Sequence, residues 1–182
     1  MSLPQTPKEW TKQTTNNSFS ISTDKTLLSL HAINTALASD TIYWANPLPE
    51  ESLQAMINNS FCFGLYKTTP HSPSTHSTDG DQKQGLEQIG FARLITDTVT
   101  IAYLTDVYIL SEYQGLGLGG WILNCVDELV KPLPHLRWFL LRTGEEASLR
   151  AYKKRYGMEV LDNGDLSQGA LFMGRKGGGN RV

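Results

Sequence analysis

Glycine is concentrated in one short stretch, SEYQGLGLGGW (residues 111–121), where four glycines fall within six positions. A strand-like apolar run precedes this stretch and an amphipathic helical pattern follows it. The amide groups at a helix N-terminus lack partners within the helix, and the positive end of the helix dipole lies there, so this arrangement can bind an anion. A plain turn needs only one glycine. We therefore predict that the stretch binds a negatively charged ligand.

Three kinds of phosphate-binding loop are compared for this stretch. Gly115, Gly117 and Gly120 match the dinucleotide pattern G-x-G-x-x-G, but that pattern needs its first glycine at the strand end and an acidic residue about twenty positions later. Neither requirement is met, and the Gly-Lys-Ser/Thr of a P-loop is absent. Gln114 to Gly119 fit a third pattern, Gln-x-x-Gly-x-Gly. A nicotinamide-dependent enzyme therefore stays the less favoured alternative.

The elements that would position this loop follow from the hydrophobic periodicity. Asp24 is expected to cap a first helix and Pro49 to begin a second, while Asp97 marks a tight turn between two strands. A third helix follows the glycines and ends at Pro132, and a fourth ends at Gly157. The strands are expected at 19–23, 61–67, 88–95, 98–110, 137–141 and 170–175. This order predicts an α/β (α+β) fold with a mixed sheet and helices on its faces.

A single domain spanning residues 18–176 is expected, because 182 residues can bury one core without disulfides or metals. Residues 1–17 read as a polar lead-in and residues 177–182 as a glycine-rich tail. Residues 68–87 contain almost no apolar side chains, which predicts a flexible surface loop inserted in the domain.

The composition excludes several classes of protein. A net charge of -2 offers no basic surface for nucleic acid, and no apolar run is long enough to cross a membrane. Cys62 and Cys125 lack CxxC spacing and lie in apolar surroundings, which is typical of packed thiols in a reducing compartment. We therefore expect a cytoplasmic protein that binds neither nucleic acid nor membrane.

The loop pattern and the element order together resemble the GNAT superfamily of acyl-CoA-dependent N-acetyltransferases over residues 19–176. The segments YWANPLPEESLQAMINNSFCFGLY, QIGFARLITD and AYLTDVYILSEYQGLGLGGWIL look like a subgroup of small GNAT proteins from bacteria and fungi. The resemblance implies a mostly antiparallel sheet that splays between its fourth and fifth strands. It also implies acetyl-CoA as co-substrate and direct transfer of the acetyl group to a primary amine in a ternary complex.

The resemblance also implies which residues bind the cofactor. The glycines would hold the pyrophosphate of acetyl-CoA, and pantetheine would pair with the exposed backbone near the end of the fourth strand. Ser148 is the polar residue nearest to the place where the family usually has an asparagine, and Lys153 would meet the 3′-phosphate. The expected cofactor-binding residues are Val107, Tyr108, Ile109, Gln114, Gly115, Leu116, Gly117, Leu118, Gly119, Gly120, Ser148 and Lys153.

Two side chains are candidates for proton transfer. Tyr152 lies on the helix where the family often has an acid that protonates the leaving thiolate, although it stands five residues before Gly157 instead of four. Asp106 is the candidate base, since a carboxylate on a half-buried strand must be paired, functional or both. Each has a structural alternative: Asp106 as a partner of Arg93 or of neighbouring amides, and Tyr152 as a packed aromatic with an exposed hydroxyl.

The resemblance places the acceptor-binding segment after the first helix, at Tyr43 and Trp44, and Arg93 is assigned to the same site. The acceptor would be a small-molecule or peptide amine; the sequence leaves its identity open, and leaves a homodimer open as well. No metal is expected, because His71 and His76 lie in the flexible loop without a rigid framework. A non-catalytic acyl-CoA-binding module is the alternative function.

Overall fold

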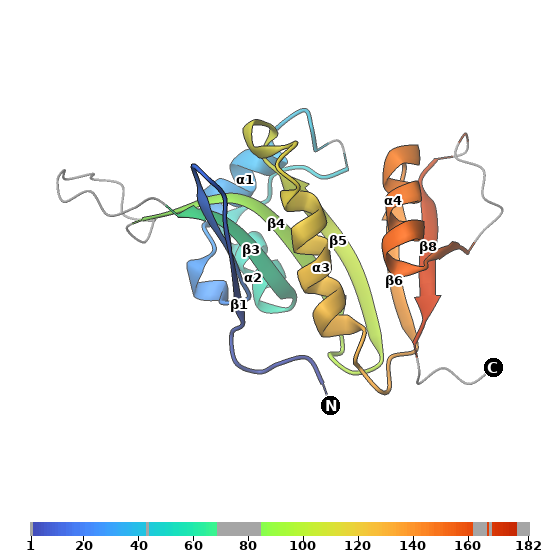
Figure 1. The fold of residues 1–182 in the computed structure, drawn as a ribbon. Helices are drawn as coiled ribbons and strands as arrows, with labels where there is room; N and C mark the ends of the chain where they lie inside the picture. The colour runs from blue at the N-terminus through green and yellow to red at the C-terminus, as the bar shows by residue number, and fades with distance from the viewer. Residues whose placement is uncertain (1, 43, 69–84, 162–166, 168, 178–182) are drawn as a thin grey trace. The chain divides into compact units, whose positions relative to one another are not determined.

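The computed structural model describes residues 2–42, 44–68, 85–161, 167 and 169–177, and Figure 1 traces its elements. In chain order, with η for a 3-10 turn, they are β1 (Glu9–Gln13), β2 (Ser18–Ser22), η1 (Lys25–Leu27), α1 (Leu30–Leu37), α2 (Glu50–Asn58), β3 (Phe61–Thr68), β4 (Leu86–Thr96), β5 (Ile101–Ile109), η2 (Ser111–Tyr113), α3 (Leu118–Val130), β6 (Trp138–Thr143), α4 (Glu146–Tyr156), β7 (Glu159–Val160) and β8 (Leu171–Lys176).

The chain forms two compact units. Unit 1 comprises residues 1–5, 94–105 and 123–182, and unit 2 comprises residues 6–93 and 106–122. Strands β4 and β5 and helix α3 contribute residues to both units, and the strand order is β1-β2-β3-β4-β5-β6-β8-β7. Strand β5 runs parallel to β6, whereas the pairs β1–β2, β2–β3, β6–β8 and β7–β8 are antiparallel. The predicted mixed, mostly antiparallel sheet with flanking helices is confirmed.

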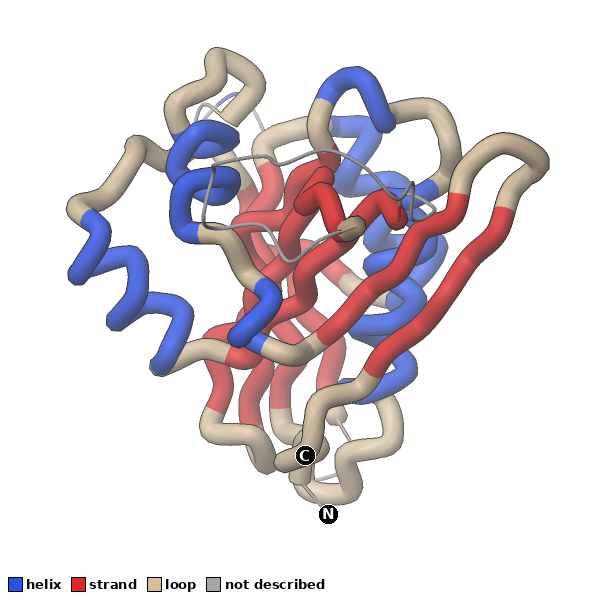
Figure 2. The backbone as a smooth tube through the Cα atoms, turned by 90° about the vertical axis from the view of Figure 1, so that its left-hand side faces the viewer, coloured by secondary structure: helices blue, strands red, loops and turns tan. Residues whose placement is uncertain are grey.

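In unit 2, helices α1 and α2 lie on one face of the strands and the first turn of α3 lies on the other (Figures 1 and 2). Ser29 caps α1 by accepting the Ala32 amide at 3.1 Å. Helix α2 begins after Pro49 with Glu50 and Glu51 in its first turn, where the helix dipole favours carboxylates. The buried cluster on this face consists of Ile33, Ala36, Leu37, Ile42, Leu53, Ile57, Cys62, Phe91 and Tyr108.

The polar lead-in contains a strand, β1, that the sequence did not predict. It pairs antiparallel with β2 through the register Glu9↔Ser22 to Gln13↔Ser18, and its residues alternate between exposed and half-buried. Trp10 fastens it to unit 2 by stacking on Phe63 with the ring centroids 6.2 Å apart. This ring is the one apolar side chain in the strand, which is too weak a pattern to identify a strand from sequence.

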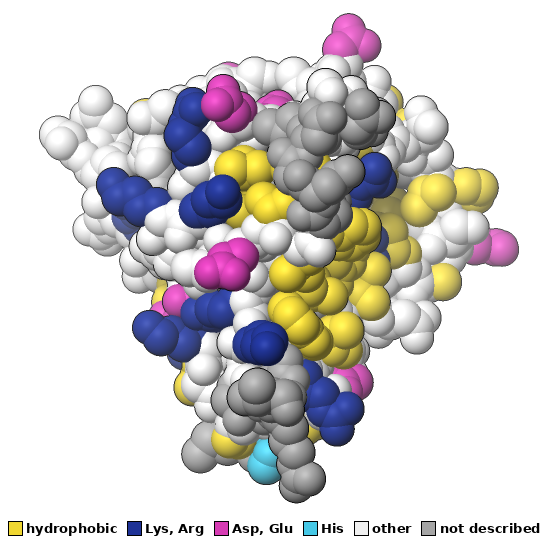
Figure 3. Space-filling model, turned by 90° about the vertical axis from the view of Figure 1, so that its right-hand side faces the viewer, with side chains coloured by type: hydrophobic (Ala, Val, Ile, Leu, Met, Phe, Trp, Pro, Cys, Tyr) yellow, Lys and Arg dark blue, Asp and Glu magenta, His cyan; other side chains and the backbone are white. Residues whose placement is uncertain are grey.

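In unit 1, α4 packs its last aromatic side chain against β6. The ring of Tyr156 lies 5.2 Å from that of Phe139, and its hydroxyl donates to the Leu123 carbonyl at 2.7 Å. Gly157, with φ +62°, ends the helix as predicted. Hydrophobic side chains also gather on the outer face shown in Figure 3, and Leu161 and Phe172 are among the exposed apolar residues of this unit.

The prediction that Asp24 caps the first helix is wrong. The Asp24 carboxylate accepts the Thr26 amide at 2.9 Å, but it caps the short turn η1, and α1 begins only after Ser29. The other predicted strands and helices are confirmed within a few residues at their ends. Most of the expected flexible loop, residues 69–84, lies outside the described residues. In the part of the chain that is described, no helix is long and apolar enough to span a membrane.

Strand β5 pairs with β6 over only part of its length; these are the fourth and fifth strands of the sequence-based order. Their register spans Ile101↔Trp138 to Leu104↔Leu141, yet β5 continues to Ile109. The last residues of β5 therefore extend beyond the parallel ladder, and their backbone is not used in pairing with β6.

Asp97 organises the turn between β4 and β5. One oxygen of its carboxylate, Oδ1, accepts the amides of Val99, Thr100 and Ile101 at 3.0, 2.7 and 3.1 Å. The hydroxyl of Thr100 donates to the other oxygen at 2.5 Å. These hydrogen bonds, led by those from Thr100, lower the pKa of Asp97 well below its usual value.

We expect Asp97→Ala to destabilise the fold by about 1 kcal/mol at pH 7, a value kept small because the turn is exposed. Because the folded-state pKa is lowered, the stabilisation is present above the unfolded pKa of about 3.9 and is lost as the pH falls. Urea unfolding of both proteins between pH 7 and pH 3 checks this. A difference that grows toward pH 3 would contradict it.

Candidate functional site

The glycine loop, residues 114–120, leads directly into α3 within unit 2. Gly115 and Gly117 have φ values of +78° and +72°, a backbone conformation that residues with a Cβ rarely adopt. The first hydrogen bond of the helix runs from the Trp121 amide to the Gly117 carbonyl at 3.1 Å. The amides of residues 118–120 therefore precede the helical ladder, where they can donate to an anion.

Side chains of two adjacent residues, Tyr113 and Gln114, fix the start of the glycine loop. The Gln114 amide group donates to the Ile109 carbonyl at 3.0 Å, which ties the loop to the end of β5. The Tyr113 hydroxyl donates to both carboxylate oxygens of Glu87 at 3.0 and 3.1 Å, and the Lys67 ammonium lies 5.4 Å from the centroid of the Tyr113 ring. The glutamine of the motif thus positions the loop through its side chain.

The end of β5 supplies backbone beside the glycine loop. Tyr108 is buried against Phe91, with ring centroids 6.2 Å apart, while Val107 and Ile109 are half-buried. The side chain of Ile109 fits between two glycines. An ideal Cβ on Gly119 would lie 3.9 Å from it, and one on Gly90 would collide with it at 2.9 Å. Gly90 therefore lets β4 approach the end of β5 closely, whereas a Cβ on Gly119 would make only an ordinary van der Waals contact.

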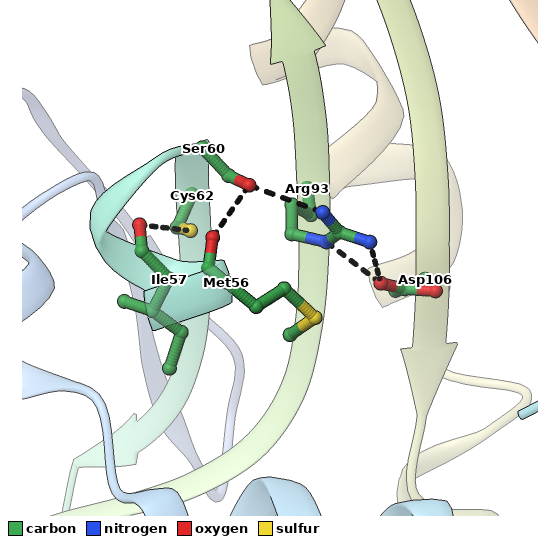
Figure 4. A network of polar contacts seen from close by, with 6 residues as sticks. All are labelled: Met56, Ile57, Ser60, Cys62, Arg93 and Asp106. Atoms are coloured by element: carbon green, nitrogen blue, oxygen red, sulfur yellow. Dashed lines mark hydrogen bonds and ion pairs between the residues drawn. The ribbon is translucent and has the colours of Figure 1, made fainter. Parts of the chain in front are cut away.

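Arg93 and Asp106 form a largely buried ion pair on neighbouring strands of unit 2 (Figure 4). Arg93 reaches Oδ2 of Asp106 with Nε and with a terminal guanidinium nitrogen, both at 2.7 Å, and each side chain is 13% exposed. Another nitrogen of the guanidinium donates to the Ser60 hydroxyl at 3.1 Å, and this hydroxyl donates to the Met56 carbonyl at 2.7 Å. The network thus joins the end of α2 to β4 and β5.

The backbone of Asp106 interrupts the regular alternation of β5. Its φ is +52°, a left-handed value that aspartate tolerates better than most residues. A residue at positive φ breaks the strict alternation of side chains along a strand. The strained residue lies where β5 passes beyond its ladder with β6, and such strain often marks functional positions.

Three other expected site residues lie on α4 in unit 1. Tyr152 is half-buried and stacks on Tyr156 with the ring centroids 6.0 Å apart. Burial, and then the charge of Glu145, raise the pKa of Tyr152, so its hydroxyl stays protonated at neutral pH. Ser148 donates to the Glu145 carboxylate at 3.2 Å, and Lys153 is exposed.

Of the two residues expected to bind the acceptor after the first helix, only Trp44 lies among the described residues. Trp44 is 45% exposed, whereas Tyr43 lies outside the described residues, as do His71 and His76. Among the residues that the structure describes, no group of three or more His, Cys, Asp or Glu side chains is placed to hold a metal ion. The structure also places Ser60 in the Arg93 network, which sequence analysis missed because a serine after a helix carries no signal of a distant partner.

Comparison with known proteins gives consistent matches. The model of the acetyltransferase (GNAT) family matches residues 39–158. A protein of Gibberella zeae that is named as an acetyltransferase is 42% identical over 154 residues, which cover 84% of each chain.

Solved structures share the fold. A crystal structure from Xanthomonas campestris, described as a GNAT-family acetyltransferase, is 33% identical with a TM-score of 0.57, covering 78% of this chain and 84% of that one. Arabidopsis thaliana NAA60 in complex with acetyl-CoA has a TM-score of 0.54 at 13% identity, covering 94% of this chain and 98% of that one. At this identity the second match supports the fold alone.

The Arg93–Asp106 pair predicts a specific pattern of stability. Arg93→Met should cost about 3 kcal/mol, because it leaves a carboxylate buried without its guanidinium. Adding Asp106→Asn should recover part of this loss, since asparagine is neutral and tolerates the positive φ. Urea unfolding of the two single variants and the double variant measures the coupling.

Arg150→Met is the matched control for this cycle. Arg150 pairs with Glu146 at 3.1 Å on the exposed face of α4, where the side chains are 66% and 73% exposed. Its loss should cost less than about 0.5 kcal/mol. A double variant whose destabilisation equals the sum of the single losses would show that Arg93 and Asp106 do not stabilise each other.

Proposed function

Because the chain belongs to the GNAT family of acetyltransferases, we propose that it transfers an acetyl group from acetyl-CoA to a primary amine. The observation that carries the proposal is the glycine loop, whose positive-φ glycines precede three amides at the start of α3. These amides suit the pyrophosphate of the co-substrate.

The end of β5 is the proposed seat of the pantetheine arm. Beyond Leu104 the strand is no longer paired with β6, so its backbone groups can pair with a ligand that mimics a strand. In this arrangement Val107, Tyr108 and Ile109 bind through their backbone, and an amide of this run faces the oxyanion that develops during transfer. Ser148 and Lys153 are the proposed contacts from α4.

Transfer proceeds by direct attack of the amine on the thioester carbonyl, without a covalent enzyme intermediate. The attacking amine loses a proton and the sulfur of coenzyme A gains one. Asp106 is the proposed base and Tyr152 the proposed acid, whose raised pKa keeps the hydroxyl protonated at neutral pH. Arg93 orients the Asp106 carboxylate through its two 2.7 Å contacts, and Trp44 contributes to the acceptor site.

The Asp106→Asn variant should lose turnover, with a loss that shrinks as rising pH deprotonates the amine.

The proposed setting is the cytoplasm, in line with the two free thiols. Cys62 and Cys125 are both buried, and burial raises the pKa of the Cys62 thiol to about 11. Both are therefore packed side chains, as the sequence predicted. The acceptor amine is the component to be identified, by following free-thiol release with a panel of amines.

Gly117→Ala tests the cofactor loop. An alanine at φ +72° costs about 1–2 kcal/mol of backbone strain or forces the loop to change shape, so we expect acetyl-CoA affinity to fall at least tenfold by calorimetry. Gly157→Ala is the matched control, because Gly157 has φ +62° with nothing within 4 Å of the added Cβ. It should lose similar stability but keep its affinity. Equal affinities in both variants would refute the assignment of the loop.

Tyr152→Phe tests the proposed acid. Removing the hydroxyl should lower kcat by about 10²-fold while the ring still packs on Tyr156 and acetyl-CoA binds as before. Tyr156→Phe is the control, because it deletes the 2.7 Å hydrogen bond to Leu123 and should cost about 1 kcal/mol of stability without a comparable loss of kcat. Unchanged turnover in Tyr152→Phe would transfer the role of acid to water or another group.

A further inference from the structure

The N-terminal hairpin carries a lysine to the glycine loop. Lys12 lies on β1, paired with Phe19 on β2, and both strands precede the residues that the family model matches. Its ammonium is 3.9 Å from the position of a Cβ built on Gly117, the only atom of the described protein close to that position besides its chain neighbours. The cation therefore lies beside the predicted pyrophosphate loop, within unit 2.

An aromatic ring holds the lysine in this place. The Lys12 ammonium lies 5.7 Å from the centroid of the Trp121 ring, which belongs to the first turn of α3. A cation over an indole ring is attracted by the negative face of the ring, and the ammonium keeps N–H donors for an anionic partner. Trp121 also donates its backbone amide to Gly117, so the ring, the lysine and the loop form one local assembly.

Among the described residues, Lys12 has no carboxylate within ion-pair distance. Its side chain is half-buried. An ammonium group binds phosphate oxygens as a compact point charge. The free helical amides and this cation would together face the same anion.

We propose that Lys12 binds the pyrophosphate of acetyl-CoA, so that the N-terminal hairpin forms part of the cofactor site. This inference rests on the proposed function, because it takes the ligand of the glycine loop from there. It adds a binding residue from outside the matched domain. It also gives the hairpin a role in acetyl-CoA binding beyond covering the edge of the sheet.

Calorimetric titration of the full chain with coenzyme A tests the proposal. Lys12→Met keeps the aliphatic stem and removes the charge, and we expect the Kd to rise about five- to tenfold at low salt. The rise should shrink with added salt, because screening weakens the charge that the substitution removes. Lys12→Arg should stay within about twofold of the unmodified chain, since it restores the positive charge.

Lys8→Met is the matched control on the same hairpin. Lys8 stands four residues before Lys12, about 13 Å away along an extended strand, and its ammonium lies 5.1 Å from the centroid of the Trp10 ring. The substitution therefore removes the same charge from another cation–π contact, about 13 Å along the chain from the lysine beside the glycine loop. We expect the Kd of this variant to be unchanged. An equal rise in both variants would overturn the proposal in favour of a general effect of net charge.

The choice of phosphate is tested with 3′-dephospho-coenzyme A, which keeps the pyrophosphate. Lys12→Met should raise the Kd of 3′-dephospho-coenzyme A by the same factor as the Kd of coenzyme A. If Lys12→Met left the Kd of 3′-dephospho-coenzyme A unchanged, the assignment to the pyrophosphate would be wrong. Gly117→Ala separates this result from the proposed function. If Gly117→Ala weakens binding and Lys12→Met does not, the role of Lys12 is wrong and the loop assignment stands.

Discussion

The unpaired amides at the start of α3 are the feature around which the rest of unit 2 is arranged. A backbone that must present consecutive N–H groups to a ligand cannot use them in its own ladder, and it must bend through positive φ to do so. Gly115 and Gly117 permit the bend, and Gln114 fastens the loop to β5 by its bond to Ile109. The loop thus contains residues that allow unusual backbone angles, and its first residue, Gln114, is held in place.

A second constraint acts on β5, because a strand that is to pair with a ligand, as we propose, needs backbone that its neighbour does not use. The ladder with β6 stops at Leu104, and Asp106 follows at positive φ. The ion pair with Arg93 holds this irregular residue and links it to Ser60 at the end of α2. Buried charge is costly unless it is paired, so the network both stabilises the irregular backbone and places a carboxylate beside the proposed transfer site.

The N-terminal hairpin extends the same logic beyond the family domain. Strand β1 has little apolar surface of its own and is held by the stacking of Trp10 on Phe63 and by its ladder with β2. Its position brings Lys12 over Trp121, beside the loop. A polar segment that contributes little to the core can therefore still place a charge beside the glycine loop.

The sequence alone determined the features that depend on local spacing. Periodicity located most of the strands and helices, and the Gln-x-x-Gly-x-Gly pattern located the loop, because glycine, helix start and strand end are neighbours along the chain. Only the tertiary structure decided which distant residues meet. The pairing of Arg93 with Asp106 was one of the alternatives that the sequence left open for this carboxylate. Ser60 and Lys12 gave no signal in the sequence. Asp24 caps η1 and not the helix that the sequence predicted. Contacts between strands depend on register, and register is set by packing that a single local pattern does not contain.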